Sequence, residues 1–331
     1  MKNLIIDSTI LITGGAGFIG SYLVEELLIH NPSKIIILDN LIRGSYQNMQ
    51  NFIGDERIQF IDGDIRETEL LEKCIAGCDF VFHMAALRIN ACAADQEEGF
   101  SVMLKSTFDL ANLCVKHKVK KVIYSSSASV YGLAQNFPTP ESDNPYDNQT
   151  FYGAAKLWGE QLFRSYKFMH NLDYVALRYF NVYGPRMDTD GKYTEVMIKW
   201  LNCIYENRSP SIFGDGTDSM DFVYVRDVAT ANVNALISDV TDEVFNIGNQ
   251  VETNLKEMLS TLLKVNNADL QPEYKEQNSI NPVARRLADI SKAKIMLGYR
   301  PSVSLEQGLR ELSQWYFNKI KNDTGSKTIF N

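Results

Sequence analysis

Two alternating patterns of apolar and polar positions run through the first half of the chain. Short runs that are continuously apolar and rich in β-branched residues alternate with amphipathic stretches of helical spacing. The apolar runs lie at residues 9–13, 34–39, 58–62, 80–84, 121–126 and 174–178, and three of the amphipathic stretches lie at residues 18–30, 100–117 and 152–170. A continuously apolar run is typical of a strand that is buried on both faces. The alternation therefore predicts an α/β fold built on a doubly wound parallel sheet with helices on both faces.

After about residue 180 the pattern loosens, and prolines and glycines become denser. Strand-like pieces recur at residues 222–225 and 244–247, and helical pieces at residues 227–237, 255–263 and 305–317. This change predicts a first domain over residues 1–180 and a smaller C-terminal α/β domain over residues 181–331. We expect a later segment, about residues 222–248, to return to the first sheet, so the boundary is not a single cut.

Composition and charge exclude several classes of protein. With 45% hydrophobic and 22% charged residues, the 331-residue chain has the balance of a globular protein with a substantial core. Its net charge of −8 argues against nucleic-acid or acidic-membrane binding, because both need a basic face. No apolar run reaches bilayer length, and the first residues run directly into a glycine motif. We therefore expect no membrane segment, no signal peptide and a cytoplasmic location.

The five cysteines are odd in number and lie mostly in apolar surroundings, which predicts reduced, buried thiols. Cys74 and Cys78 have no paired Cys or His set nearby, so we expect no metal site.

The strongest local signal is the glycine motif from Thr13 to Gly20, which follows the first predicted strand and opens the first predicted helix. Gly14 permits a tight turn, Gly17 lets the backbone approach a pyrophosphate, and Gly20 allows the helix to pack closely on the strand. The N-terminus of the helix then offers free N–H groups and a partial positive charge to phosphates. The motif therefore predicts a Rossmann-type dinucleotide site.

Two acids at the ends of the next strands fit the same ligand. Asp39 ends the second strand, 19 residues after Gly20, where a carboxylate accepts hydrogen bonds from ribose hydroxyls and repels a 2′-phosphate. NAD is therefore favoured over NADP, although Asp39 could also serve only to form a turn with Asn40. Asp64 ends the third strand, where it could meet the adenine or cap the following helix.

Tyr152 and Lys156 stand four residues apart at the start of a helical pattern, so they share one helix face. A free phenol has a pKa of about 10, and a nearby cation lowers that pKa because it favours the phenolate. The pair therefore predicts a general base. Three serines, Ser125 to Ser127, end the fifth strand, at the carboxyl edge of the sheet where ligands bind in this class of fold. One of them is well placed to hydrogen-bond the same substrate hydroxyl as Tyr152.

Together these motifs resemble the extended short-chain dehydrogenase/reductase family, in particular its nucleotide-sugar epimerases and dehydratases. The motifs that carry the resemblance span nearly the whole chain and are residues 13–20, Asp39-Asn40, 63–65, 83–86, 125–132, Tyr152-xxx-Lys156, 178–186, 214–216, 221–225 and 287–289. Jointly they are specific for the family but not for one substrate.

The resemblance implies an NAD-dependent reaction on a nucleotide sugar. Tyr152 would take the proton from a sugar hydroxyl, usually O4, while hydride passes from that carbon to NAD. Ser127 would hydrogen-bond the same oxygen, and Lys156 would hold the nicotinamide ribose. The implied cofactor-binding residues are Gly14, Gly17, Phe18, Ile19, Gly20, Asp39, Asn40, Asp64, Ile65, Ala85, Ala86, Ser125, Tyr152, Lys156 and Tyr179. The implied substrate-binding residues are Leu87, Ser127, Asn181, Arg186, Thr194, Phe213, Arg285 and Arg286.

The residues after Ser127 favour a 4-epimerase, an isomerase, among the reactions of the family. Family dehydratases place acids there, whereas Ala128 and Ser129 cannot act as carboxylate acids or bases. The same difference argues against a uronate decarboxylase, while a 4-dehydrogenase that releases a keto sugar would need only the same residues. The sugar of the predicted epimerase could be a UDP-hexose, a UDP-N-acetylhexosamine or a UDP-uronate, and a 4,6-dehydratase or a 4-dehydrogenase, including one for a GDP-sugar, is the alternative.

Departures from the family pattern concern the substrate side. Met220 stands where the family often has a diphosphate arginine, and a second such arginine would fall near Ser279. Arg186, Arg285 and Arg286 are the available replacements, because a diphosphate favours bidentate guanidinium. Two rival interpretations are a sensing protein without turnover, which Tyr152 and Lys156 argue against, and an NADPH reductase, which Asp39 argues against. The family further implies a homodimer through the helices at residues 100–117 and 152–170.

Overall fold

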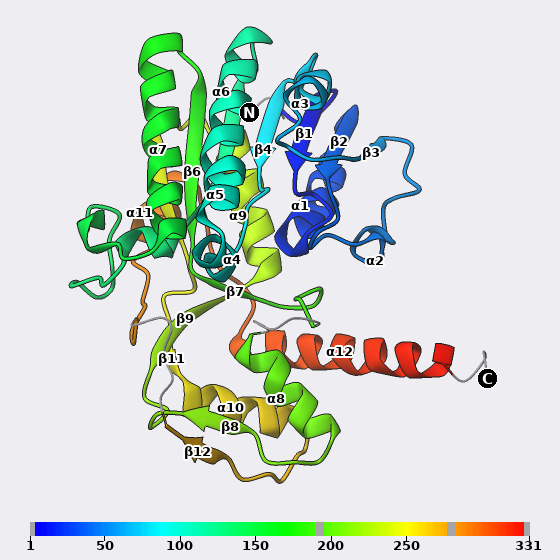
Figure 1. Cartoon of the computed structure of the whole chain (residues 1–331), viewed down its shortest axis with the longest axis vertical. Coiled ribbons are helices and arrows are strands. Elements are labelled where there is room, and N and C mark those ends of the chain that lie inside the picture. The colour runs from blue at the N-terminus through cyan, green and yellow to red at the C-terminus, as the bar shows by residue number, and fades with distance from the viewer. Residues whose placement is uncertain (1–3, 190–194, 277–282, 328–331) are drawn as a thin grey trace.

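The central sheet contains seven parallel strands in the order β10-β6-β5-β4-β1-β2-β3 (Figure 1). The computed structural model describes residues 4–189, 195–276 and 283–327. The strands of this sheet are β1 (Thr9–Thr13), β2 (Lys34–Asp39), β3 (Ile58–Asp62), β4 (Phe80–His83), β5 (Lys121–Ser127), β6 (Asp173–Tyr179) and β10 (Glu243–Ile247). The predicted doubly wound parallel sheet is thereby confirmed, with each of the six apolar runs forming one strand.

Helices cover both faces of the sheet because side chains along each strand alternate between the two faces. Ile10 and Ile12 pack in a core with α1 (Phe18–Ile29) and α9 (Val225–Ile237). Leu11 points the other way, into a core with three further helices. These helices are α3 (Thr68–Ile75), α6 (Ser106–Lys116) and α7 (Phe151–His170).

The stretch expected to form one helix at residues 100–117 is interrupted. It consists of α5 (Gln96–Phe100), a π-helical turn η1 (Ser101–Lys105) and α6. The turn places Met103 so that its sulfur accepts a hydrogen bond from the Leu87 amide at 3.2 Å. Such π-helical turns often occur at functional sites.

The remaining chain forms a smaller α/β part below the central sheet (Figure 1). One sheet joins β11 (Glu252–Asn254), β9 (Ser219–Tyr224) and β7 (Asn181–Tyr183), and a second joins β12 (Glu273–Lys275) and β8 (Ser211–Phe213). A separate core around Trp200 packs α8 (Val196–Tyr205), α10 (Leu255–Val265) and α12 (Leu305–Lys327). Of the segment at about residues 222–248, β10 lies in the central sheet, whereas β9 lies in the small one.

Short helices fill the connections. They are α2 (Tyr46–Met49), α4 (Ile89–Ala94), η2 (Ala128–Tyr131), η3 (Pro145–Asp147) and α11 (Ser291–Met296). Across the described ranges, no helix combines the length and the apolar character that a bilayer crossing requires.

A buried ion pair fixes α7 against the middle of the sheet. The guanidinium of Arg178 on β6 donates to both carboxylate oxygens of Glu160 on α7, at 2.9 and 2.7 Å. The Ser126 hydroxyl on β5 donates to the same carboxylate at 2.5 Å. Only 6% of the Arg178 side chain and 1% of the Glu160 side chain are exposed. The pair thus joins two neighbouring strands to the helix that carries Tyr152 and Lys156.

We expect Glu160→Gln to lower the free energy of unfolding by about 3–5 kcal/mol, because the Arg178 charge would stay buried without its counter-charge. Urea titration followed by circular dichroism measures this loss. The control is Arg310→Ala, which breaks an exposed pair with Glu306 and should cost less than about 1 kcal/mol. A loss for Glu160→Gln no larger than that of the control would contradict a structural role for the buried pair.

Candidate active site

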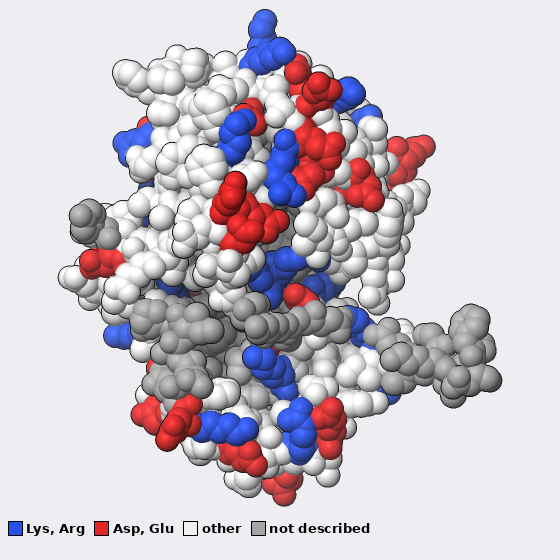
Figure 2. All heavy atoms as spheres, viewed as in Figure 1, with Lys and Arg blue, Asp and Glu red and all other residues white. Residues whose placement is uncertain are grey.

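A large pocket lies at the carboxyl ends of the central strands, where the sheet meets the smaller part of the chain. Its cavity measures about 480 Å³, within the range of small-molecule sites. Basic side chains gather in the hollow between the upper and lower halves of the molecule (Figure 2). The arginines that line the pocket are Arg43, Arg66, Arg88 and Arg186. Acids line the pocket as well, so its positive charge is local to these arginines, where an anionic group of a ligand could bind.

The glycine turn forms one wall of this pocket and has no room for side chains. Gly14 adopts a φ of +73°, and a Cβ added there would lie 2.8 Å from the Ala85 nitrogen. A Cβ on Gly20 would lie 2.2 Å from the Gly14 oxygen. Helix α1 begins after Gly17 without a side-chain cap or an acid in its first turn, so its free N–H groups are available to phosphate. This backbone cradle fits the pyrophosphate of a dinucleotide.

Asp39 and Asp64 line the pocket beyond the glycine turn. The Asp39 carboxylate accepts hydrogen bonds from the backbone amides of Ala16 at 3.0 Å and Leu41 at 2.9 Å. Burial raises the pKa of Asp39 above its usual value, although these amides lower it. The Asp64 carboxylate binds Arg66 and Asn40, and its hydrogen bond from Arg66 lowers its pKa to about 2. Asp64 does not cap α3, whose N-cap is Glu67.

Ser127 and Tyr152 meet at the inner end of the pocket. Ser127 ends β5, and its hydroxyl oxygen accepts a hydrogen bond from the Ser129 amide at 3.1 Å. Tyr152 lies in the first turn of α7, which Thr150 caps through the Gly153 amide. Burial raises the pKa of the Tyr152 phenol, and the nearby Ser127 hydroxyl lowers it. Both residues line the same pocket.

Lys156 lies one turn further along α7 and is buried. Its ammonium donates to the Ser125 carbonyl oxygen at 2.5 Å and lies 5.8 Å from the centre of the Tyr152 ring. Burial lowers the pKa of Lys156 to about 8. Ser127 and Arg43 are the largest contributions that lower the pKa of Tyr152. The lowering by Lys156 that the sequence predicts stays a prediction.

Fourteen of the fifteen predicted cofactor-binding residues line this one pocket, and the fifteenth, Lys156, lies directly behind it through its bond to Ser125. Tyr179 reaches the pocket from β6 and donates its hydroxyl to Asn232 at 2.8 Å. Among the residues that the structure describes, no cluster of His, Cys, Asp or Glu is arranged to hold a metal ion.

The predicted substrate-binding residues are more scattered. Leu87, Ser127, Asn181 and Arg186 line the pocket, and Arg186 is held there by Ser21 at 3.0 Å and Glu25 at 2.5 Å. Three others lie outside the lining of this pocket. Phe213 is 48% exposed on β8, Arg285 pairs with Glu252 on the surface, and Arg286 lines a second, smaller cavity. Thr194 lies outside the described residues.

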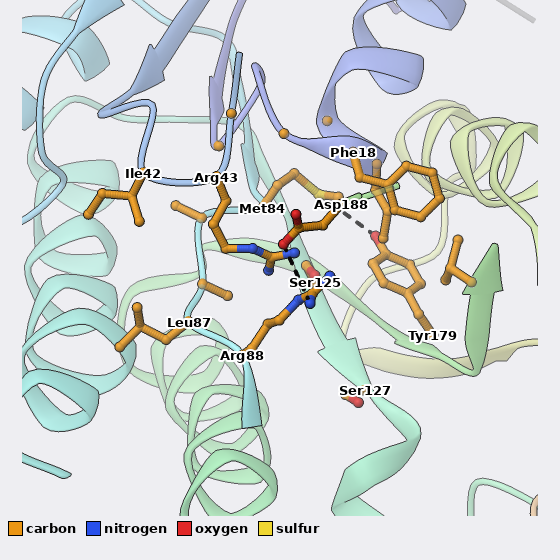
Figure 3. Close-up of a pocket in the computed structure, with 18 of the residues that line it drawn as sticks. Phe18, Ile42, Arg43, Met84, Leu87, Arg88, Ser125, Ser127, Tyr179 and Asp188 are labelled. Atoms are coloured by element: carbon orange, nitrogen blue, oxygen red, sulfur yellow. Dashed lines mark hydrogen bonds and ion pairs between the residues drawn. The ribbon is translucent and has the colours of Figure 1, made fainter. Parts of the chain in front are cut away.

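Sequence reasoning missed several charged residues of the pocket, and three of them are drawn together in Figure 3. Arg43 follows β2, Arg88 follows β4, and Asp188 follows β7. Arg88 and Asp188 approach each other at 3.6 Å, and Arg43 interacts electrostatically with both as well as with Tyr152. The available signal was their position, since Arg43 and Arg88 each come a few residues after the carboxyl end of a parallel strand.

Comparison with known proteins gives consistent relatives. The model of the NAD dependent epimerase/dehydratase family matches residues 10–248. A putative UDP-glucose 4-epimerase of Methanocaldococcus jannaschii is 33% identical and covers 93% of this chain and 98% of its own. The solved UDP-N-acetylglucosamine 4-epimerase of Methanobrevibacter ruminantium, in complex with UDP-N-acetylmuramic acid, is 34% identical with a TM-score of 0.90 and covers 95% of this chain and 99% of its own. The UDP-glucuronic acid 4-epimerase of Bacillus cereus, solved with UDP-glucuronic acid and NAD, is 31% identical with a TM-score of 0.86. The match covers 94% of this chain and 99% of that structure's chain.

We expect Gly20→Ala to weaken NAD binding by roughly 10- to 100-fold, because the new methyl group would collide with the Gly14 carbonyl and displace the turn. Titration calorimetry with NAD, together with the cofactor content of the purified protein, measures the effect. Gly54→Ala is the matched control, since a Cβ at Gly54 meets nothing within 4 Å. Unchanged NAD binding in Gly20→Ala would show that the turn does not hold the dinucleotide.

Proposed function

Because the chain belongs to the NAD dependent epimerase/dehydratase family, we propose that it is an NAD-dependent 4-epimerase of a UDP-linked sugar. The observation that carries the proposal is the placement of Ser127 and Tyr152 in the same pocket as the glycine turn. A base and a hydroxyl donor are thereby held where a dinucleotide and a sugar can both reach them.

Tyr152 and Ser127 would carry out the proton transfer of the reaction. The Tyr152 oxygen takes the proton from the sugar 4-hydroxyl, and Ser127 donates a hydrogen bond at the same position. NAD, which the glycine turn and Asp39 would hold, would supply the hydride acceptor and donor for C4 of the sugar. Lys156, fixed by the Ser125 carbonyl, holds its positive charge beside the Tyr152 ring and is the residue that we expect to bind the nicotinamide ribose. Return of the proton from Tyr152 completes the inversion.

The surroundings of Tyr152 favour inversion over elimination. Removal of water from C5 and C6 in a 4,6-dehydratase needs further acids and bases, which Ala128 and Ser129 cannot supply. With no carboxylate at positions 128 and 129, the Tyr152 phenol is the base that we assign to this part of the pocket.

The remaining expectations extend the same proposal. Residues 1–180 would hold NAD through the pocket residues after β1, β2 and β4, and residues 181–331 would hold the nucleotide sugar, with Asn181 and Arg186 nearest to it. We expect a cytoplasmic enzyme that serves polysaccharide biosynthesis. A homodimer through α6 and α7 is supported by exposed apolar side chains on these helices, of which Phe108 is 42% and Phe168 is 91% exposed.

The purified enzyme, given UDP-glucose, UDP-N-acetylglucosamine, UDP-glucuronate or a GDP-sugar without added cofactor, should invert C4 of at least one UDP-sugar with no net NADH. NMR of the products measures this. Tyr152→Phe should abolish turnover and leave NAD binding intact, because it removes the base alone. A 4-keto-6-deoxy product would identify a dehydratase, a 4-keto product with net NADH would identify a dehydrogenase, and retained turnover in Tyr152→Phe would remove Tyr152 from the base role.

Arg43→Met should move the acid limb of the kcat–pH profile to higher pH. The base works as a phenolate, and the Arg43 charge lowers the Tyr152 pKa, so loss of that charge raises the pKa and requires a higher pH for the same rate. The control is Arg164→Met on α7, the helix that also carries Tyr152. The Arg164 side chain is 66% exposed. An acid limb that stays in place or moves to lower pH would contradict the coupling of Arg43 to Tyr152.

A further inference from the structure

A second, smaller cavity of about 20 Å³ adjoins the main pocket on the side of the catalytic serine. Ile89 and Ser129 line both cavities, so they form a shared wall. Thr150 and Arg286 contribute to the far side. The volume accommodates about one water molecule or the end of a small substituent.

The guanidinium of Arg286 enters this cavity without a counter-charge. One of its nitrogens donates to the Ala128 carbonyl oxygen at 2.6 Å, and within the described ranges no carboxylate forms an ion pair with it. Asp147 also lies on the wall, but its carboxylate accepts a hydrogen bond from Gln135 at 3.3 Å. Burial lowers the pKa of Arg286 to about 10, so it remains a cation at neutral pH.

Two other arginines of this region are compensated. The buried Arg178 carries a bidentate bond to Glu160, and Arg186, whose side chain is 10% exposed, is bound to Glu25. A partly buried guanidinium without a counter-charge loses some of its hydration, and an anion placed in the cavity would offset that loss. The natural occupant of the cavity is therefore an anionic group that arrives from the main pocket.

The position of Arg286 identifies where that group sits on the sugar. Arg286 binds the carbonyl of Ala128, the residue next to Ser127, so it lies beside the point where the 4-hydroxyl is held. On a hexose ring the carbons next to C4 are C3, which carries a hydroxyl, and C5, which carries C6. Of these two, C6 is the one that is oxidised to an anion in a sugar acid.

We propose that Arg286 binds the C5 carboxylate of a hexuronate, so that the substrate class of this enzyme is the UDP-uronates. The inference rests on the proposed 4-epimerase function, because it uses Ser127 and Tyr152 to place C4. A planar guanidinium matches a carboxylate in a bidentate bond, and Ser129 on the shared wall can donate a further hydrogen bond.

The same surroundings favour retention of the carboxylate. A 4-keto uronate is a β-keto acid, and loss of carbon dioxide would leave the electron pair of the C5–C6 bond in an enolate that needs a proton at C5. Ala128 and Ser129 provide no acid there, while Arg286 stabilises the charged carboxylate. We therefore expect a product uronate with C4 inverted and all carbons retained.

The test compares binding of UDP-glucuronate and UDP-glucose to the NAD-loaded Tyr152→Phe enzyme by calorimetry, since this variant does not convert either ligand. We expect UDP-glucuronate to bind roughly 10- to 100-fold more tightly. Arg286→Met should abolish that preference while the affinity for UDP-glucose stays within about twofold. Arg164→Met, an exposed arginine on α7, should keep the full preference.

Arg286→Lys keeps the charge and loses the bidentate fork, so it should retain part of the preference; it also replaces Arg286→Met if that variant does not fold. Equal affinities for the two ligands in the Tyr152→Phe enzyme, or a preference that survives Arg286→Met, would overturn the proposal. NMR of the active enzyme separates this failure from that of the parent function. If the enzyme inverts UDP-glucose and shows no preference for the uronate, the epimerase function holds and the Arg286 site is wrong. If it prefers the uronate but yields a decarboxylated product, the Arg286 site holds and the epimerase function is wrong.

Discussion

The site depends on how firmly helix α7 is fixed to strands β5 and β6. Tyr152 and Lys156 come from the helix, and Ser125 and Ser127 come from β5, so a shift of one turn between the two would separate these residues. The Glu160–Arg178 pair, with Ser126 bound to the same carboxylate, joins all three elements below the pocket. Such a buried pair contributes geometry more than stability, because desolvation offsets most of its attraction. The catalytic arrangement is therefore built on a polar connection inside an apolar layer.

Electrostatics explain how an acidic protein presents a site for anions. The pocket collects arginines from separate loops, and acids from the same region hold several of them in place, as Asp188 does for Arg88 and Glu25 for Arg186. Each such pair keeps a guanidinium near the cavity at a modest cost of solvation. Local charge at the ligand site and net charge of the whole chain are thus independent properties of the sequence.

Much of the fold could be predicted from the sequence, because strands buried on both faces are continuously apolar and leave a clear pattern. The short strands β7, β8, β11 and β12 could not, since three residues carry no periodicity and pair only through contacts distant in the sequence. The residues of the site also divide into those that the sequence could predict and those that it could not. Gly14, Gly20, Tyr152 and Lys156 belong to local motifs, whereas the positions of Phe213 and Arg285 on the surface depend on the folding of the smaller part. Arg43 and Arg88 lie in loops whose direction only the assembled sheet determines.

The hydrogen bonds of Asp39 have a consequence for how this protein could diverge. Its carboxylate accepts hydrogen bonds from the Ala16 and Leu41 amides and so fixes two loops, besides lining the pocket. A change to a small neutral residue, the usual first step toward accepting a 2′-phosphate, would leave both amides without their acceptor in a buried place. Evolution from NAD to NADP use would therefore require either a less stable intermediate protein or simultaneous changes in both loops.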